Sequence, residues 1–180
     1  GETELKARVP HVKFEYNSDL RIPEVITPDV WAARIEPLTE PTGLGRAEVL
    51  RNFIRDNSRL IGMADHQTSQ LKVTADYTNP DGNISYAELE QEINGIPVFR
   101  GTVRAGFNRD GQIIPIINNL APGLEYASLP NDFGDPLEAV KAAAGHIRHE
   151  FKSGDLDMNK SASGDLKAVF GTGDWAATFA

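Results

Sequence analysis

The chain has 180 residues, of which 40% are hydrophobic and 24% charged, and its 18 basic and 26 acidic side chains give a net charge of −8. A chain of this length can bury a core without metals or disulfides. The acidic balance argues against a nucleic-acid partner, because such proteins need a clustered basic surface. The lack of cysteine excludes disulfides, thiolate zinc sites and cysteine nucleophiles. No apolar run approaches the ~20 residues of a membrane span, so we expect none.

The first 45 residues are rich in proline and carry one short strand-like pattern. In residues 12–16 apolar and charged side chains alternate, as they do in a half-buried strand. We expect residues 1–45 to form an irregular N-terminal arm that lies on another surface, and not a domain. The aromatic side chains of Phe14, Tyr16 and Trp31 are its candidate interface contacts.

Residues 46–61 predict a helix, because their apolar side chains recur at helical spacing and Gly62 suits a helix C-terminus. Four strand-like segments follow between about residue 70 and residue 119, joined by turns. An antiparallel sheet with one buried face needs a cover, and the preceding helix can supply it. We therefore predict an α+β domain over residues 46–124, a cystatin-like helix followed by a four-stranded antiparallel meander.

Two local signals define the predicted strands further. Asn94-Gly95 predicts a tight hairpin turn with Gly95 left-handed, because both residues tolerate positive φ. Pro115 lacks an amide donor, so the last strand is expected at a sheet edge or with a bulge there. The two periodicities together predict a core made of Phe53, Ile54, Leu71, Val73, Leu89, Phe99, Val103 and Phe107.

Gln91 lies on the inward, apolar face of its predicted strand, between Leu89 and Ile93. A buried amide must be hydrogen-bonded. Two interpretations are open: a structural hydrogen bond to the first helix or the arm, or a specificity contact with a protein that docks on the sheet.

A second unit is predicted after a linker over residues 125–134. Asp135-Pro136-Leu137-Glu138 is a good helix start, with Asp as the N-cap and Pro at the first helical position. An apolar stripe then continues to Phe151, and residues 166–180 predict one or two strands. Residues 135–180 are too few to complete a second sheet, so we expect an incomplete α+β unit and a natural polypeptide that continues.

The sequence carries little catalytic chemistry. A His-Glu-x-x-His zinc motif is absent, and the pair His146 and His149 is a poor metal site with only two ligands. The run Glu88, Glu90 and Glu92 is expected to face water, with cation binding as the alternative. We expect no catalytic residue, cofactor or metal in this chain.

The segment LEQEINGIPVFRGTVRAGFNRDGQI resembles the core of the fungalysin/thermolysin propeptide domain. The resemblance is carried by Gln91, Ile93, Asn94, Gly95, Ile96, Pro97, Val98, Phe99, Gly101, Asp110 and Gly111. The helix and strand that precede this segment stand in the order of that family. The segment PLEAVKAAAGHI of the second unit resembles the opening of the PepSY module, which follows the propeptide domain in these precursors.

The resemblance implies the non-catalytic pro-region of a secreted zinc metalloendopeptidase precursor. It implies an extracellular protein whose partner is its own catalytic domain, held in cis, which the pro-region helps to fold and keeps inhibited. Zinc would belong to that absent catalytic domain. We expect aromatic side chains outside the first core to contribute to the interface, and these are Phe14, Tyr16, Trp31, Trp175 and Phe179.

Two other classes of function stay open at this point. One is a free-standing, cystatin-like protein-binding or inhibitor module, with homodimers possible through exposed strand edges. The other is a small-ligand carrier, which requires an apolar pocket between the helix and the sheet.

Overall fold

The chain folds as two units, residues 1–126 and residues 127–180. The computed structural model describes residues 1–82, 84–128, 134–151, 156–164, 167–171 and 177–179. Within these ranges, none of the helices has the length and apolar character that a membrane crossing requires.

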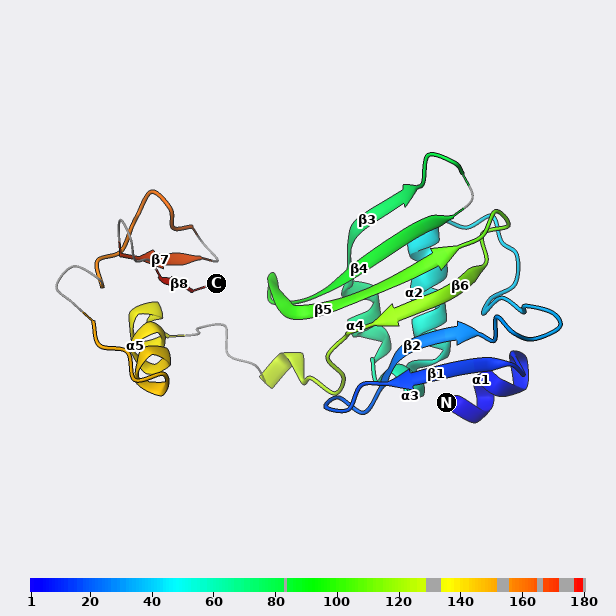
Figure 1. Cartoon of the computed structure of the whole chain (residues 1–180), viewed down its shortest axis with the longest axis horizontal. Helices are drawn as coiled ribbons and strands as arrows, with labels where there is room; N and C mark the ends of the chain where they lie inside the picture. The colour runs from blue at the N-terminus through cyan, green and yellow to red at the C-terminus, as the bar shows by residue number, and fades with distance from the viewer. Residues whose placement is uncertain (83, 129–133, 152–155, 165–166, 172–176, 180) are drawn as a thin grey trace. The chain divides into compact units, whose positions relative to one another are not determined.

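The first unit is built on one antiparallel sheet of six strands, in the order β1-β2-β6-β5-β4-β3 (Figure 1). The strands are β1 (Val12–Tyr16), β2 (Pro23–Pro28), β3 (Lys72–Thr78), β4 (Ser85–Ile93), β5 (Ile96–Phe107) and β6 (Ile113–Asn118). The predicted α+β class is confirmed. Strands β3 to β6 neighbour one another in chain order, but the sheet has six strands where four were predicted.

The two additional strands come from the N-terminal segment, so the prediction of an irregular arm is wrong. The segment forms α1 (Glu2–Arg8) and a β1–β2 hairpin, and β2 pairs with β6 through Val25 and Ile117. Leu5 and Ile26 are fully buried in the core. The prolines did not prevent this, because Pro23 and Pro28 are the first and last residues of β2 and leave its interior intact.

Strand β6 lies inside the sheet, between β2 and β5, so the edge position predicted from Pro115 is wrong. The predicted alternative was a bulge at Pro115, and the strand pairing does show an irregular register there. The β5–β6 register shifts between Ala105 and Phe107, beside Pro115. Gly106 stands there with the proline ring so close that an added Cβ would lie 3.1 Å from Pro115 Cδ. The sheet thus accommodates the missing amide donor of Pro115 by a local shift in the β5–β6 register.

Helices α2 (Arg46–Asp56), α3 (Ser58–Ile61) and α4 (Asp65–Gln70) follow the N-terminal hairpin. Figure 1 shows α2 and α4 behind one face of the sheet, while the other face is left open. The single helix predicted over residues 46–61 is divided at Asn57, whose side chain donates to the Phe53 carbonyl and accepts from Arg8. Gly62 ends α3 in the left-handed conformation with φ 79°, as its position predicted.

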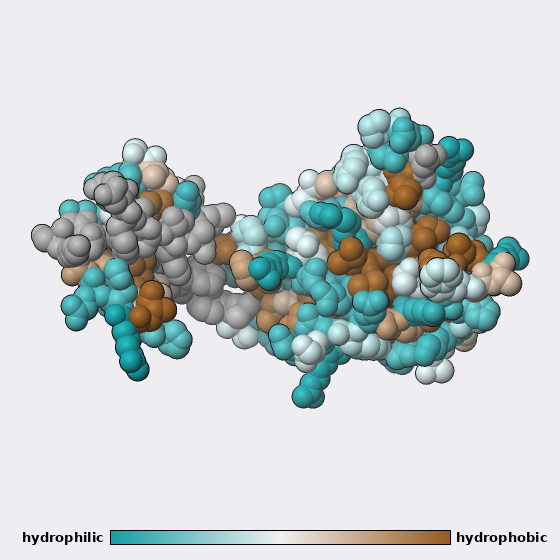
Figure 2. All heavy atoms as spheres, in the orientation of Figure 1, coloured by the Kyte–Doolittle hydropathy of each residue, from teal (hydrophilic) through white to brown (hydrophobic). Residues whose placement is uncertain are grey.

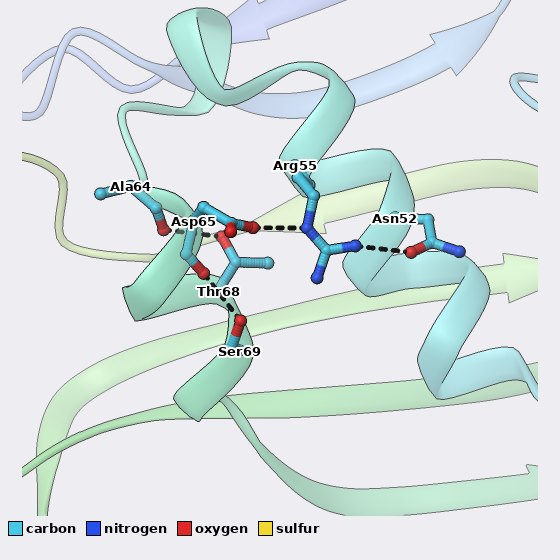
Figure 3. Close-up of polar contacts among 6 residues, drawn as sticks. All are labelled: Asn52, Arg55, Ala64, Asp65, Thr68 and Ser69. Atoms are coloured by element: carbon cyan, nitrogen blue, oxygen red, sulfur yellow. Dashed lines mark hydrogen bonds and ion pairs between the residues drawn. The ribbon is translucent and has the colours of Figure 1, made fainter.

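Figure 3 shows how α4 is fixed against α2. The Arg55 guanidinium donates to the Asp65 carboxylate at the start of α4 and to Asn52 Oδ1 at 2.9 Å. Thr68 and Ser69 donate their hydroxyls to the carbonyls of Ala64 and Asp65, four residues earlier in each case. These bonds fix the start of the connection from the helices to β3.

The core of the first unit lies between the helices and the inward side chains of the sheet. Six of the eight predicted core residues are buried: Phe53, Ile54, Leu71, Leu89, Val103 and Phe107. The prediction for Val73 is wrong, since 43% of its surface is exposed. Val73 lies in β3, which is an edge strand, and the register of β3 with β4 shifts just after this residue. The prediction for Phe99 is also wrong, since 87% of its surface is exposed. The reason for this exposure is the shape of the β4–β5 hairpin, described below.

The second unit contains α5 (Pro136–His146), β7 (Ala168–Phe170) and β8 (Ala177–Phe179). Asp135 caps α5 as predicted, accepting a hydrogen bond from the Leu137 amide at 2.8 Å. The helix is shorter than its apolar stripe predicted and ends before Ile147, which is 74% exposed. The side chains that pack together here are Val140, Ala168 and Phe170, with Leu137, Phe151 and Leu156 against them.

We predict that the N-terminal helix contributes strongly to the stability of the first unit. Leu5→Ala should lower the free energy of unfolding by about 2–5 kcal/mol, because Leu5 is fully buried and its truncation leaves a cavity. Leu44→Ala is the matched control, since Leu44 is exposed and should change stability by less than about 0.5 kcal/mol. Urea unfolding of the full chain measures both, and equal stabilities would contradict the packing of α1 against the core.

Candidate functional site

The β4–β5 hairpin carries most of the residues singled out from the sequence. Its turn is Asn94-Gly95, with φ values of 54° and 80°, and the flanking Ile93 and Ile96 pair directly. Two successive left-handed residues are the geometry that favours Asn-Gly in a two-residue hairpin. The predicted left-handed Gly95 is therefore confirmed.

Just beyond this turn, β5 contains a large bulge. Glu92 pairs with Pro97, and the next paired residues are Glu90 and Thr102. Gln91 alone therefore lies opposite the four-residue stretch 98–101. Unpaired residues of this kind bend a strand and redirect its side chains. We call residues 98–101 the β5 bulge.

Two residues shape the β5 bulge. Arg100 has a left-handed backbone with φ 57°, which side-chain-bearing residues adopt rarely. Gly101 packs so tightly that an added Cβ would lie 2.8 Å from Val98 Cβ and 3.1 Å from the Val98 carbonyl oxygen. Glycine is thus required at position 101 by space.

Phe99 projects outward because of this bulge. In an unbroken strand it would share the inward face with Val103 and Ala105, which are buried. The left-handed residue at position 100 breaks that alternation. The Arg100 guanidinium carbon lies 5.2 Å from the centre of the Phe99 ring. The two side chains form an exposed cation–aromatic pair at the end of the sheet.

Gln91 is completely buried and fully hydrogen-bonded. Its Oε1 accepts from the Ala121 amide at 2.8 Å, and its Nε2 donates to the Ala121 carbonyl at 3.1 Å and to Tyr126 Oη at 2.8 Å. These contacts agree with a structural hydrogen bond, but the partner is the segment after β6 and not the first helix or the arm. That partner lies 30 residues further along the chain and has no sequence signal.

Sequence analysis missed a second buried glutamine, Gln67, which holds the same segment. Its Oε1 accepts from the Ala64 amide at 2.9 Å, and its Nε2 donates to the Leu124 carbonyl. The capping-box pattern needs Ser or Thr at the N-cap, and the N-cap here is Ala64, so the sequence carries only the glutamine half of that signal. Burial raises the pKa of the Tyr126 hydroxyl, and the hydrogen bond from Gln91 opposes that rise. The two glutamines thus anchor the chain from Ala121 to Tyr126.

The open face of the sheet carries paired charges and aromatic rings. Glu88 accepts from Arg104 Nε at 2.9 Å and from Thr74 at 3.0 Å, and Lys72 donates to Glu92 at 2.7 Å. These contacts fit the expected solvated face. In the ranges that the structure describes, no group of three or more His, Asp or Glu side chains could hold a metal ion.

Apolar side chains lie among these charges. The rings of Tyr77 and Tyr86 lie 5.3 Å apart on neighbouring strands, and Ile117 is 46% exposed on β6. Figure 2 shows hydrophobic residues gathered over the middle of this face, surrounded by hydrophilic ones. Such a mixed surface is typical of protein interfaces more than of a small-molecule site.

The aromatic interface candidates of the N-terminal segment differ in exposure. Phe14 packs partly against the core, and Tyr16 is 49% exposed while its hydroxyl donates to Glu2 at 2.8 Å. Trp31 is 88% exposed beyond the end of β2. In the second unit, Phe179 lies in β8, and Trp175 falls outside the described residues.

Comparison with known proteins gives one match, and it includes the β4–β5 hairpin. Residues 69–120 match the family model described as the Fungalysin/Thermolysin Propeptide Motif, over less than half of the chain. No curated protein matches the chain. The matched residues contain β3 to β6, and with them Gln91, the Asn94-Gly95 turn and the β5 bulge. The matched motif is by its description one of propeptides, and it is not that of a catalytic domain.

We predict that Gln91 is essential for stability. Gln91→Leu should lower the free energy of unfolding by about 2 kcal/mol or more, because it leaves the buried polar groups of Ala121 and Tyr126 without their partner. Gln70→Leu, at an exposed position in α4, is the control and should have little effect. Guanidinium unfolding followed by fluorescence measures the difference, and similar values for the two variants would contradict the role of Gln91.

We also predict that the β5 bulge accepts only glycine at position 101. Gly101→Ala should cost about 1–3 kcal/mol, because its Cβ would collide with Val98. Gly43→Ala is the control, since an added Cβ there meets nothing within 4 Å. If thermal unfolding shows the two substitutions to be equally tolerated, the tight packing of the bulge is wrong.

Proposed function

We propose that this chain is the non-catalytic pro-region of a secreted zinc metalloendopeptidase precursor of the fungalysin/thermolysin kind. It binds the catalytic domain of the same precursor in cis, assists its folding and holds it inactive until cleavage. The observation that carries this proposal is the propeptide-motif match over residues 69–120, which covers the hairpin, the bulge and the buried Gln91.

The architecture of the first unit supports a docking role. Its helices cover one face of the sheet, and the other face and the β5 bulge present aromatic and charged side chains to solvent. A partner that binds only the native state of a protein stabilises that state by mass action. Attachment in one polypeptide raises the effective concentration of the partner, so modest contacts suffice.

The finer parts of the proposal rest on the resemblance of the sequence. The first unit is taken as a cystatin-like arrangement of helix and sheet, and the second as the start of a PepSY-like module. The protein acts outside the cell, and zinc belongs to the catalytic domain and not to this chain. Self-association through the edge strands β1 and β3 is the competing use of the sheet.

A small-ligand carrier has less support. Such a protein needs an apolar cavity between α2 and the sheet, but the side chains there, including Phe53, Leu89 and Phe107, pack as a core. A groove of about 310 Å³ lies elsewhere, beside α2 and the end of α1, and Arg8, Asn52 and Asp56 line it together with apolar residues. Its open, charged lining is unlike that of a typical small-molecule site.

The proposal is tested by adding the purified 180-residue chain to the mature protease from the same precursor. We expect the rate of peptide cleavage to fall as the chain approaches stoichiometric amounts, and the yield of protease refolded from denaturant to rise. Phe107→Ala is the control, because it truncates a core side chain and should abolish both effects by disrupting the fold. If a large molar excess of the wild-type chain changes neither quantity, the free-standing binding module takes the place of the pro-region.

A further inference from the structure

The β5 bulge combines two features that oppose the stability of the isolated chain. Phe99 leaves 87% of its surface in water, and Arg100 adopts a left-handed backbone with φ 57°. An exposed large apolar side chain gains no burial energy, and positive φ is costly for a residue with a Cβ. Features of this kind persist where the surrounding structure enforces them, and they cluster at functional sites.

The surroundings of the β5 bulge do enforce it. Gly101 packs against Val98, the Asn94-Gly95 turn fixes the tip of the hairpin, and Gln91 on the opposite strand is bound to Ala121. The backbone that carries the aromatic ring is therefore held in a prearranged position. Prearrangement of this kind lowers the entropy lost on binding and so favours association.

The chemistry of the pair defines what it fits. The Phe99 ring calls for an apolar pocket of phenyl size. Arg100 forms no ion pair with the part of the chain that the structure describes, although its guanidinium carbon lies only 5.2 Å from the ring centre. A buried guanidinium needs a carboxylate to compensate its lost hydration. The complementary surface is an apolar pocket with an acidic group on its rim.

We propose that Phe99 and Arg100 are the anchor through which this chain binds the catalytic domain of its precursor. Phe99 inserts into an apolar pocket of that domain, and Arg100 pairs with a carboxylate at the rim of the pocket. This inference rests on the proposed function, and it adds the surface and the chemistry of the contact. The propeptide-motif match that supports that partner covers both residues.

A second copy of the chain is a poorer occupant of this anchor. In a two-fold symmetric dimer the same surface meets itself, so the two Arg100 guanidinium groups would lie near each other. Like charges at a shared contact repel, and the β5 bulge itself, residues 98–101, carries no carboxylate to offset them. The charge of the anchor therefore favours a different, acidic partner.

The test compares Phe99→Ala, Phe99→Leu and the control Ile147→Ala in the full chain, titrated against the mature protease. We expect the inhibition constant to rise about tenfold or more for Phe99→Ala, as for an interface hot spot, and less for Phe99→Leu, which keeps an apolar side chain. Ile147→Ala removes another exposed apolar side chain, 74% exposed, and should leave the constant unchanged. The melting temperature should be unaltered in all three variants, because neither side chain is buried in the chain itself.

Arg100 is tested by Arg100→Lys, Arg100→Gly and Arg100→Glu. We expect the three to weaken inhibition progressively, because the charge is kept, removed and reversed, while Arg100→Gly relieves the positive φ. The wild-type inhibition should weaken as salt rises, and that of Arg100→Gly should depend on salt less. Equal inhibition by the wild type and Arg100→Glu would contradict the proposed pairing of Arg100 with a carboxylate at the rim of the pocket.

The outcomes separate this inference from the proposed function. If the wild-type chain inhibits or refolds the protease and Phe99→Ala does so equally well, the pro-region stands and the anchor is wrong. If Phe99→Ala lowers the melting temperature, or converts a dimer of the chain to a monomer in gel filtration, the ring is an internal or self-association contact and the anchor is again wrong. If the wild-type chain has no effect on the protease, the proposed function fails, and the anchor fails with it.

Discussion

The buried amide of Gln91 is the interaction on which the first unit depends. It joins the end of β4, close to the hairpin turn, to the backbone of Ala121 and to the hydroxyl of Tyr126, so one side chain links the hairpin to the point where the unit ends. Burying an amide lowers stability unless all of its polar groups are hydrogen-bonded. These hydrogen bonds form only when β4 pairs with its neighbours in a single register, because a shift by one residue would turn Gln91 to the other face. That requirement explains a polar residue in an otherwise apolar strand face, directly opposite the bulge.

The sheet has one face covered by helices and one open face. All the helices between β2 and β3 pack on the side where Leu89, Val103 and Ile116 point inward. The opposite side keeps paired charges such as Glu88 with Arg104, together with aromatic rings. Stability therefore resides on one side of the sheet, and the other side and the hairpin end are free to meet a partner.

Sequence patterns predicted what is local in this fold. The alternation in β4, the left-handed Gly95 and the Asp135 cap each depend on residues within a few positions of one another. What could not be predicted depends on distant pairing: β2 meets β6 across about ninety residues, and Gln91 finds Ala121. The exposure of Phe99 was missed for a related reason, because strand periodicity assumes an unbroken strand and the β5 bulge interrupts it.

The central position of β6 also sets the order in which the sheet can be completed during synthesis. The strand made last lies between the hairpin made first and the strand made just before it. The β1–β2 hairpin therefore has no place in the sheet until residue 118 has left the ribosome. Until then its apolar residues Val12 and Ile26 lack the sheet neighbours that cover them in the finished fold, which exposes the growing chain to aggregation and makes it a natural client for chaperones that bind nascent chains.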